Sequence, residues 1–213
     1  MSEKACLSCV NCSIYNCRNR NAKFPAFCPT ENKTSNSEVN ELNEIYKGDS
    51  IDGRMACAAA QIEGNFYRQK TRVEETVLFI QKIGAKRVGI ATCFGLINEA
   101  KVFAAILKKN NIEYTSVICK VGGEDKCNMG LSPEDKICKG EHFEAMCNPI
   151  LQARILNRAH TDLNIAIGLC VGHDALFSKY SDAPVTTLIV KDRVLGHNPV
   201  AALYTHYYRD LYK

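Results

Sequence analysis

Hydrophobic and polar residues follow two different periods along the chain, and the change falls at Gly84. Before it, apolar residues recur at helical spacing through residues 53–82, a stretch that Gly64 is expected to split into two helices. After it, short apolar runs typical of buried strands alternate with helical stretches. The predicted strands are 87–92, 114–118, 163–169 and 185–190, and the predicted helices are 97–110, 149–159 and 174–180. This alternation predicts an α/β fold with a mostly parallel, doubly wound, Rossmann-like sheet of about four strands.

Composition divides the chain into three expected segments. Residues 1–32 are dense in Cys, Asn and Pro and contain few apolar residues, so something other than hydrophobic burial must order them. Residues 33–82 are expected to form a helical linker region, and residues 83–213 the α/β domain. Inside that domain, the polar stretch 121–146 is a long insertion at a predicted strand end, where a lid would lie.

The overall composition narrows the classes of function. Of 213 residues, 46% are hydrophobic and 23% charged, enough for a sizeable core. The 27 basic and 23 acidic residues are scattered, and their net charge of +4 does not indicate a nucleic-acid groove. No apolar run is long enough to cross a bilayer and the first residues do not resemble a signal peptide, so we expect a cytoplasmic protein without a membrane partner. A tyrosine-rich stripe between Tyr204 and Tyr212 favours docking to the core or a contact within a homo-oligomer.

The unusual feature of the composition is its 12 cysteines, which occur without any tryptophan. A chain of this length with a core of its own does not need disulfides, and nothing directs it to an oxidising compartment. Closely spaced reduced thiols therefore indicate metal or redox chemistry.

The first cysteine group lies near the amino terminus. Cys6, Cys9 and Cys12 are separated by two residues each, Cys17 follows, and Cys28 precedes a proline. Such spacing lets one tight loop aim several sulfurs at one centre while backbone N–H groups offset their charge. It favours a [4Fe–4S] cluster over zinc, which normally uses two separated Cys-x2-Cys pairs. The fourth ligand is open between Cys17 and Cys28, and surface thiols without a metal are the remaining alternative.

The second cysteine group is brought together only by the predicted fold. Cys93, Cys119 and Cys170 each follow or end a predicted strand, so we expect them at the carboxyl edge of the sheet, where α/β proteins bind ligands. Cys147, just before a predicted helix, joins them if the insertion returns there. Three cysteines at equivalent strand ends favour a metal or cluster site over catalytic thiols without metal or ordinary core packing. No role is assigned to Cys57, Cys127 or Cys138.

Polar residues are expected around this second group of thiols. We expect His173 and Lys191 to act as catalytic acid–base groups. The residues expected to bind a cofactor or ligand are Gly172, Asp174, Arg193 and His197. A solvated turn, or a hydrogen bond within a loop, is the alternative interpretation for each of the residues beyond the fourth strand.

Several short stretches of the sequence are characteristic of one family. They are the Cys-x2-Cys-x2-Cys run, Arg72–Glu75, Ile90–Leu96, Glu99–Ala100, Cys119–Lys120, Cys147–Pro149, Gly168–Asp174 and Lys191–Pro199. Together they resemble a domain-of-unknown-function family of cysteine-rich prokaryotic proteins, commonly labelled metal-binding and frequent in anaerobes. The resemblance covers nearly the whole chain. It implies metal binding in the cytoplasm and supplies no reaction.

These observations lead to competing functions. The first is an iron–sulfur protein with an N-terminal cluster and a second cysteine-ligated metal or cluster at the sheet edge, serving electron transfer or redox and sulfur chemistry. Its partner is then an electron-transfer protein or a small-molecule substrate. The alternative is a zinc-binding structural or interaction module without catalysis. A metal store or chaperone is a third interpretation.

Overall fold

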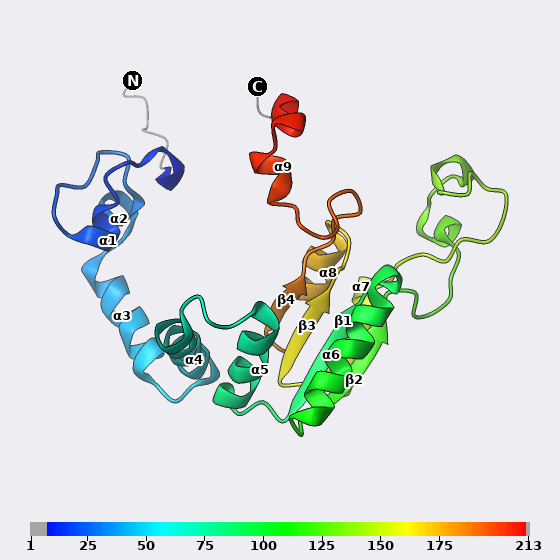
Figure 1. The fold of residues 1–213 in the computed structure, drawn as a ribbon, viewed down its shortest axis with the longest axis horizontal. Coiled ribbons are helices and arrows are strands. Elements are labelled where there is room, and N and C mark those ends of the chain that lie inside the picture. The colour runs from blue at the N-terminus through cyan, green and yellow to red at the C-terminus, as the bar shows by residue number, and fades with distance from the viewer. Residues whose placement is uncertain (1–7, 212–213) are drawn as a thin grey trace. The chain divides into compact units, whose positions relative to one another are not determined.

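The structure is a computed structural model that describes residues 8–211 (Figure 1). Internal contacts divide the chain into two compact units, with the boundary between Cys57 and Ala58. The first unit carries the amino-terminal cysteines and the second carries the sheet, so the two cysteine groups belong to different units. Within residues 8–211, no helix is both long and apolar enough to span a membrane.

Hydrogen bonds from polar side chains help to order the described part of the first unit. Its helices are α1 (Asn16–Asn19), α2 (Pro29–Lys33) and α3 (Asn36–Lys47). The carboxamide oxygen of Asn16 accepts from the N–H of Ala22 at 2.9 Å. The Asn32 side chain donates to the carbonyl oxygens of Ala26 and Cys28. None of the residues of α3 is buried, so a large hydrophobic core does not form around this helix.

The helix break before the sheet lies later than predicted. α4 (Ile51–Phe66) continues through Gly64, and α5 (Arg72–Ile83) begins after a turn. A capping box sets this start, because the Thr71 hydroxyl accepts from the Glu74 N–H and the Glu74 carboxylate accepts from the Thr71 N–H. A glycine inside a helix costs only about 1 kcal/mol, whereas the cap satisfies donors that have no partner within the helix. The prediction that Gly64 splits the helix was wrong for this reason.

The second unit is built on one parallel sheet, as predicted. Its strands are β1 (Arg87–Thr92), β2 (Glu113–Ile118), β3 (Leu163–Ile167) and β4 (Val185–Ile189), in the order β2-β1-β3-β4. The connecting helices are α6 (Ile97–Lys109), α7 (Pro149–Arg158) and α8 (His173–Tyr180). Because every neighbouring pair is parallel, the carboxyl ends of the strands reach one edge of the sheet. The α/β, Rossmann-like fold is confirmed.

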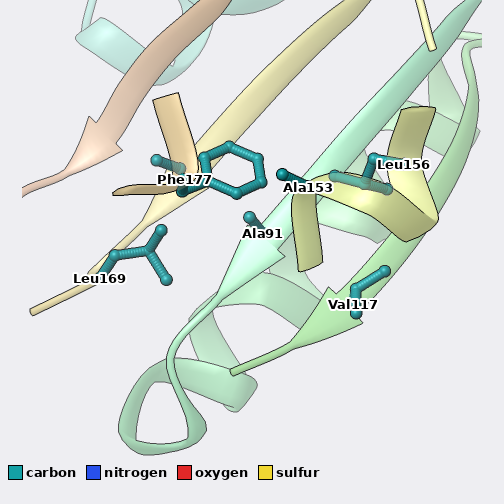
Figure 2. Close-up of a cluster of buried hydrophobic side chains, with 7 residues drawn as sticks. Ala91, Val117, Ala153, Leu156, Leu169 and Phe177 are labelled. Carbon is teal, nitrogen blue, oxygen red and sulfur yellow. The ribbon is translucent and has the colours of Figure 1, made fainter. Parts of the chain in front are cut away.

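Helices cover both faces of the sheet. On one face, Ala91 of β1 belongs to a buried cluster with Leu156 of α7 and Phe177 of α8 (Figure 2). Small residues such as Ala91 let these helices approach the sheet closely. Because side chains alternate along a strand, Val88 and Ile90 of β1 point to the opposite face, where α6 packs (Figure 1). The central strands are therefore buried on both sides, as in other doubly wound sheets.

The insertion after β2 is held together by charged side chains. It contains two 3₁₀ turns, Lys126–Met129 and Pro133–Asp135. Lys136, whose side chain is buried, pairs with Asp125 at 2.6 Å. Lys126 pairs with Glu144, next to a short antiparallel bridge between Asp125 and Ala145. The outgoing and returning chains of the insertion are therefore held side by side.

The segment after β4 ends in short helical turns with exposed aromatic side chains. These turns are α9 (Ala201–Tyr204) and a 3₁₀ segment (His206–Leu211). Tyr204 is 83% exposed and Tyr207 is 86% exposed. Tyr204 and Tyr207 therefore do not dock on the core, whereas Tyr208 is partly buried and Tyr212 lies outside the described residues. The other interpretation, a subunit contact, stays a prediction.

Gly89 provides a test of the packing between β1 and α7. A Cβ at this position would collide with the carboxamide oxygen of Asn164 and approach Leu156 Cδ1 to 2.8 Å. The Asn164 side chain cannot easily move away, because it is buried and its carboxamide oxygen accepts a hydrogen bond from the Thr161 hydroxyl at 2.8 Å. We expect Gly89→Ala to lower the free energy of unfolding by about 1–3 kcal/mol, measured by urea denaturation.

Gly64→Ala is the matched control for this substitution. Gly64 is exposed in α4, and a Cβ there would meet no atom within 4 Å. The free energy of unfolding should stay unchanged or rise by about 1 kcal/mol, because alanine favours the helix. Equal effects of the two substitutions would contradict the close packing at Gly89.

Candidate functional site

Backbone hydrogen bonds bring three distant cysteines to the carboxyl edge of the sheet. Directly after β1, Cys93 donates its N–H to the carbonyl oxygen of Ile167 at 3.0 Å. Directly after β2, Cys119 donates its N–H across to β1 at 2.8 Å. The returning insertion then adds a further bond, from the Asn148 N–H to the Cys119 carbonyl oxygen at 2.8 Å. Cys147 consequently lies beside Cys119, and their Sγ atoms are 3.8 Å apart.

Cys93 is a buried thiol surrounded by hydrogen-bond donors. The Cys119 thiol donates to it, and this bond is the largest cause that lowers the pKa of Cys93 from 9.0 to about 5. The Gly95 N–H and the ammonium of Lys191, whose Nζ lies 3.3 Å from Cys93 Sγ, act in the same direction, while burial opposes them. Cys93 is therefore a thiolate at neutral pH.

Cys147 becomes a thiolate for related reasons. Its hydrogen bond with Cys119 is the largest cause that lowers the pKa of Cys147 to about 5, and the positive charges of Lys120 and His173 add to it. Hydrogen bonds with Cys147 and Cys93, followed by burial, raise the pKa of Cys119, even though the Phe94 N–H donates to its sulfur at 3.2 Å. The pKa shifts thus favour a proton on Cys119 and the anionic form of Cys93 and Cys147.

Cys170, three residues after β3, provides a fourth sulfur at this edge. Nη2 of Arg193 donates to Cys170 Sγ at 3.0 Å, and this contact is the largest cause that raises the pKa of the guanidinium. The charges of Cys93 and Cys147 raise the pKa of Arg193 further. Three sulfurs therefore act on the same cation, and the fourth, of Cys119, contacts Cys147. We call these four cysteines the sheet-edge thiol site.

Asp192 orders the loop that carries the two cations of this site. Its carboxylate accepts from the N–H groups of Val194 at 2.9 Å and Leu195 at 2.7 Å. His197 supports the same loop, because its Nδ1 accepts from the Asp192 N–H at 3.1 Å. The contact of His197 is thus a hydrogen bond within the loop, which was the alternative to ligand binding.

The remaining predicted residues lie at the start of α8. Gly172 precedes the helix with a φ of +83°, a left-handed conformation that glycine adopts without strain. His173 is the first helical residue, and its charge favours the thiolate of Cys147. The Asp174 carboxylate accepts from the Ala175 N–H at 2.8 Å, within the first turn. Of these residues, His173 acts on a sulfur, whereas the bond of Asp174 is local to the helix.

Sequence reasoning missed several groups around these sulfurs. The Phe94 and Gly95 N–H groups and the Lys120 ammonium were not assigned, although each is next to or close to a cysteine in the sequence. Gln152 of α7 was missed because nothing in the pattern marks it. Its fully buried side chain donates to carbonyl oxygens near the ends of β1 and β2 at 3.2 and 2.8 Å. Within the described chain, Gln152 Oε1 is buried without a hydrogen-bond partner.

The sulfurs contact one another and the neighbouring cations. In the part of the chain that the structure describes, no three His, Cys, Asp or Glu side chains are arranged to hold one metal ion. The contacts at the sheet-edge thiol site are instead thiol–thiolate and thiolate–cation hydrogen bonds. A metal bound there would replace the proton of Cys119 and draw the sulfurs around itself.

The amino-terminal cysteines form a separate candidate site in the first unit. One cavity of about 60 Å³ is lined by Cys9, Cys12, Cys17 and Cys28, together with Tyr15, Phe24, Pro25 and Phe27. The Tyr15 N–H donates to Cys12 Sγ at 3.4 Å, the kind of bond that offsets thiolate charge. Cys6 lies outside the described residues. Because Cys17 and Cys28 both reach the cavity, both alternatives for the fourth ligand stay open.

A larger cavity in the second unit contains no cysteine. It measures about 550 Å³ and lies beside α4, α5 and β4, with Tyr67 and Phe79 among its lining residues. Arg72 also lines it, but this side chain already donates to the carbonyl oxygen of Thr187 at 2.8 Å. Cys93 and Cys147, whose thiol pKa values are strongly lowered, lie at the sheet edge. That edge is therefore the stronger candidate for a reactive site.

Comparison with known proteins places the chain in a family. A family profile described as "Protein of unknown function (DUF1847)" matches residues 28–188. The chain belongs to this family. "Uncharacterized protein MJ0455" of Methanocaldococcus jannaschii is 50% identical over 181 residues, which are 85% of this chain and 91% of that protein. The predicted resemblance to a family of unknown function is confirmed, and neither description mentions a metal. The DUF1847 match includes all four sheet-edge cysteines and ends before Lys191.

The low thiol pKa values predict an unusual titration. In reduced protein freed of metal by a chelator, we expect two thiols to ionise near pH 5, visible as ultraviolet thiolate absorbance. In Cys119→Ala the hydrogen-bond partner that lowers both pKa values most is lost, so the midpoint should move toward the ordinary value of 9.0. Cys127→Ala, at an exposed thiol of the insertion, is the control and should keep the low midpoint. If all thiols of the wild-type protein ionised in one step near the ordinary thiol pKa of 9.0, the proposed hydrogen bonds would be contradicted.

Proposed function

We propose that this protein is a cytoplasmic iron–sulfur protein with two cysteine-ligated centres, serving electron transfer or redox and sulfur chemistry on a small molecule. The observation that carries the proposal is the convergence of Cys93, Cys119, Cys147 and Cys170, from four separate segments, at one edge of the sheet. Isolated core cysteines would not need cations, yet here Lys191 and Arg193 each contact a sulfur. Thiolates that face cations and N–H donors are suited to an anionic metal centre.

The chemistry of the sheet-edge thiol site fits an iron–sulfur group. Thiolate is the ligand that such clusters require, and N–H donors to sulfur, such as those of Phe94 and Gly95, tune their potentials. A bound cluster would supply one-electron transfer. The residues of the chain would then balance charge through Lys191 and Arg193, while His173, whose charge already acts on Cys147, holds or moves a proton.

The amino-terminal site supports a second centre of the [4Fe–4S] type. Four described thiols line one small cavity whose other walls include aromatic and proline side chains. A backbone N–H donates to Cys12 as it does to Cys119, which is the same means of offsetting sulfur charge. With Cys6, five thiols are available in this segment for a cluster that needs four.

One observation favours zinc as the second candidate. Two thiolates bound about 2.3 Å from a tetrahedral ion lie about 3.8 Å from each other. The separation of Cys119 Sγ and Cys147 Sγ is 3.8 Å, so these sulfurs already have the spacing of two ligands on a single ion. In that case the protein is a structural or interaction module held by zinc, and the sheet-edge cations stabilise its thiolates.

Metal analysis of anaerobically purified protein distinguishes the two candidates. The iron–sulfur proposal requires a brown protein that contains iron and acid-labile sulfide. Because the two cysteine groups are separate, Cys93→Ser and the double variant Cys9→Ser/Cys12→Ser, which leaves three of the five amino-terminal thiols, should each remove about half of the iron and leave the rest. Cys127→Ser, at an exposed thiol outside both groups, is the control and should keep all of it. A colourless protein with stoichiometric zinc would establish the alternative, and full iron retention in both variants would contradict both sites.

The charge of Lys191 gives a further test of the sheet-edge centre. A cation beside a cluster stabilises its more negative, reduced form, so Lys191→Gln should lower the reduction potential while iron content is kept. Lys101→Gln, an exposed position on α6, is the control for removing one charge from the surface. Redox titration followed by absorbance measures the shift. An unchanged potential in Lys191→Gln would mean that no redox centre lies next to Cys93.

A further inference from the structure

Cys119 and Cys147 are poised for a reaction with each other as well as with a metal. Their sulfurs are 3.8 Å apart, and a disulfide needs about 2.05 Å, so a movement of less than about 2 Å would join them. The backbone hydrogen bond from Asn148 to Cys119, 2.8 Å long, already holds the two chain segments next to each other. Side-chain rotation rather than a change of fold would close the remaining distance.

The two cysteines stand at the base of the insertion. Cys119 directly follows β2, where the chain leaves the sheet for the insertion. Cys147 directly follows the insertion and precedes Asn148, which caps α7. The Met146 N–H donates to Glu124 O at 2.8 Å and the Lys120 ammonium donates to Ala145 O, so the base is closed by other bonds as well. A covalent link there would fasten segments that are already in contact.

The two sulfurs differ in solvent exposure, so they would react in different steps. Cys119 is buried, with 3% of its surface exposed, whereas Cys147 is half-buried and open to a small reactant. Cys147 is therefore the thiol that attacks the small disulfide first, and Cys119 then attacks Cys147 to complete the reaction.

We propose that Cys119 and Cys147 form a reversible disulfide with small-molecule disulfides as oxidant, and that this link excludes metal from the sheet-edge thiol site. The second part rests on the proposed function, because it requires a metal that uses these thiolates. The link consumes two of the four sulfurs, and a metal bound to them in turn blocks the link. Thiol oxidation and metal loading are thus competing states of one site.

The reaction is an ordinary thiol–disulfide exchange in two steps. The Cys147 thiolate attacks one sulfur of the small disulfide, whose S–S bond breaks and releases one thiol after it takes up a proton from water. Cys119 then gives its proton to water and attacks Cys147 Sγ in the mixed disulfide, and the second small thiol leaves. Overall, one small disulfide is reduced to two thiols, and the two cysteines lose two electrons.

The experiment treats the full-length, anaerobically purified protein with cystamine, before and after metal removal by a chelator. In metal-free protein we expect a peptide map that joins Cys119 to Cys147, whereas exposed thiols such as Cys127 gain a cysteamine adduct. With metal present at ten times its Kd, roughly one-tenth of the protein is free, so the link should form about tenfold more slowly. A peptide map that shows no Cys119–Cys147 link in metal-free protein would overturn the disulfide.

Single variants test the order of the two steps. Cys119→Ser should retain a cysteamine adduct on Cys147, because the second attack is lost, whereas Cys147→Ser should acquire little adduct on the buried Cys119. The double variant Cys127→Ser/Cys138→Ser removes the thiols within the insertion and should still form the link. Preferential modification of Cys119 would reverse the assigned order and overturn it. Circular dichroism of each variant establishes that it is folded.

The two parts of the proposal fail separately. If no metal binds at all, the proposed function and the exclusion fail, while the peptide map still decides the disulfide. If metal binds and the link forms at the same rate with or without it, the exclusion is overturned and the metal centre stands.

Discussion

Parallel pairing of β1 with both of its neighbours is the constraint on which the candidate site depends. The register pairs Thr92 of β1 with Ile118 of β2 and with Ile167 of β3. Cys93 and Cys119 are the next residues after the first two strands, so they leave the sheet at the same level. A slip of one residue would turn the side chains of the shifted strand to the other face and separate the sulfurs. The faces of β1 differ in side-chain size, since Gly89 and Ala91 face α7 while Val88 and Ile90 face α6, and this difference opposes such a slip.

The charge at this edge follows from the order of the strands. β4 lies next to β3, and the loop after β4 delivers Lys191 to Cys93 and Arg193 to Cys170. Gathering thiolates without cations would be unfavourable, because like charges repel in a partly buried site. Asp192 organises that loop through hydrogen bonds to backbone N–H groups. The anionic sulfurs and their counter-charges therefore come from different strands and depend on the assembled sheet.

The two cysteine groups arise in physically different ways. The amino-terminal cysteines are close in sequence, so short-range turns suffice to direct Cys9 and Cys12 toward one cavity. The sheet-edge cysteines are separated by whole strand–helix units, and their contact depends on the packing of α7 and α8 on the sheet. The insertion shows the same dependence, since its return at Asn148 decides where Cys147 lies. One group is thus a product of local structure and the other of the fold.

Most elements and their parallel arrangement were predictable from periodicity, and so was the placement of Cys93 and Cys119 at one edge. The helix break was misplaced because the glycine at position 64 is a weaker signal than the capping box at Thr71. The role of Gln152 was beyond the pattern, because a helical face does not reveal which distant atom it meets. Lys191 and Arg193 were expected near the thiols, but the sulfur that each one contacts could not be predicted.

The sequence by itself determined the strands, the helices and the residues that follow each strand, because these depend on hydrogen bonding and burial within short segments. Only the tertiary structure decided that Cys147 contacts Cys119, that Lys191 and Arg193 reach separate sulfurs, and that His197 turns to its own loop. The contacts of the cysteines join residues more than twenty positions apart in the chain, and that of His197 lies within one loop. They exist only when packing and register fix every segment at once.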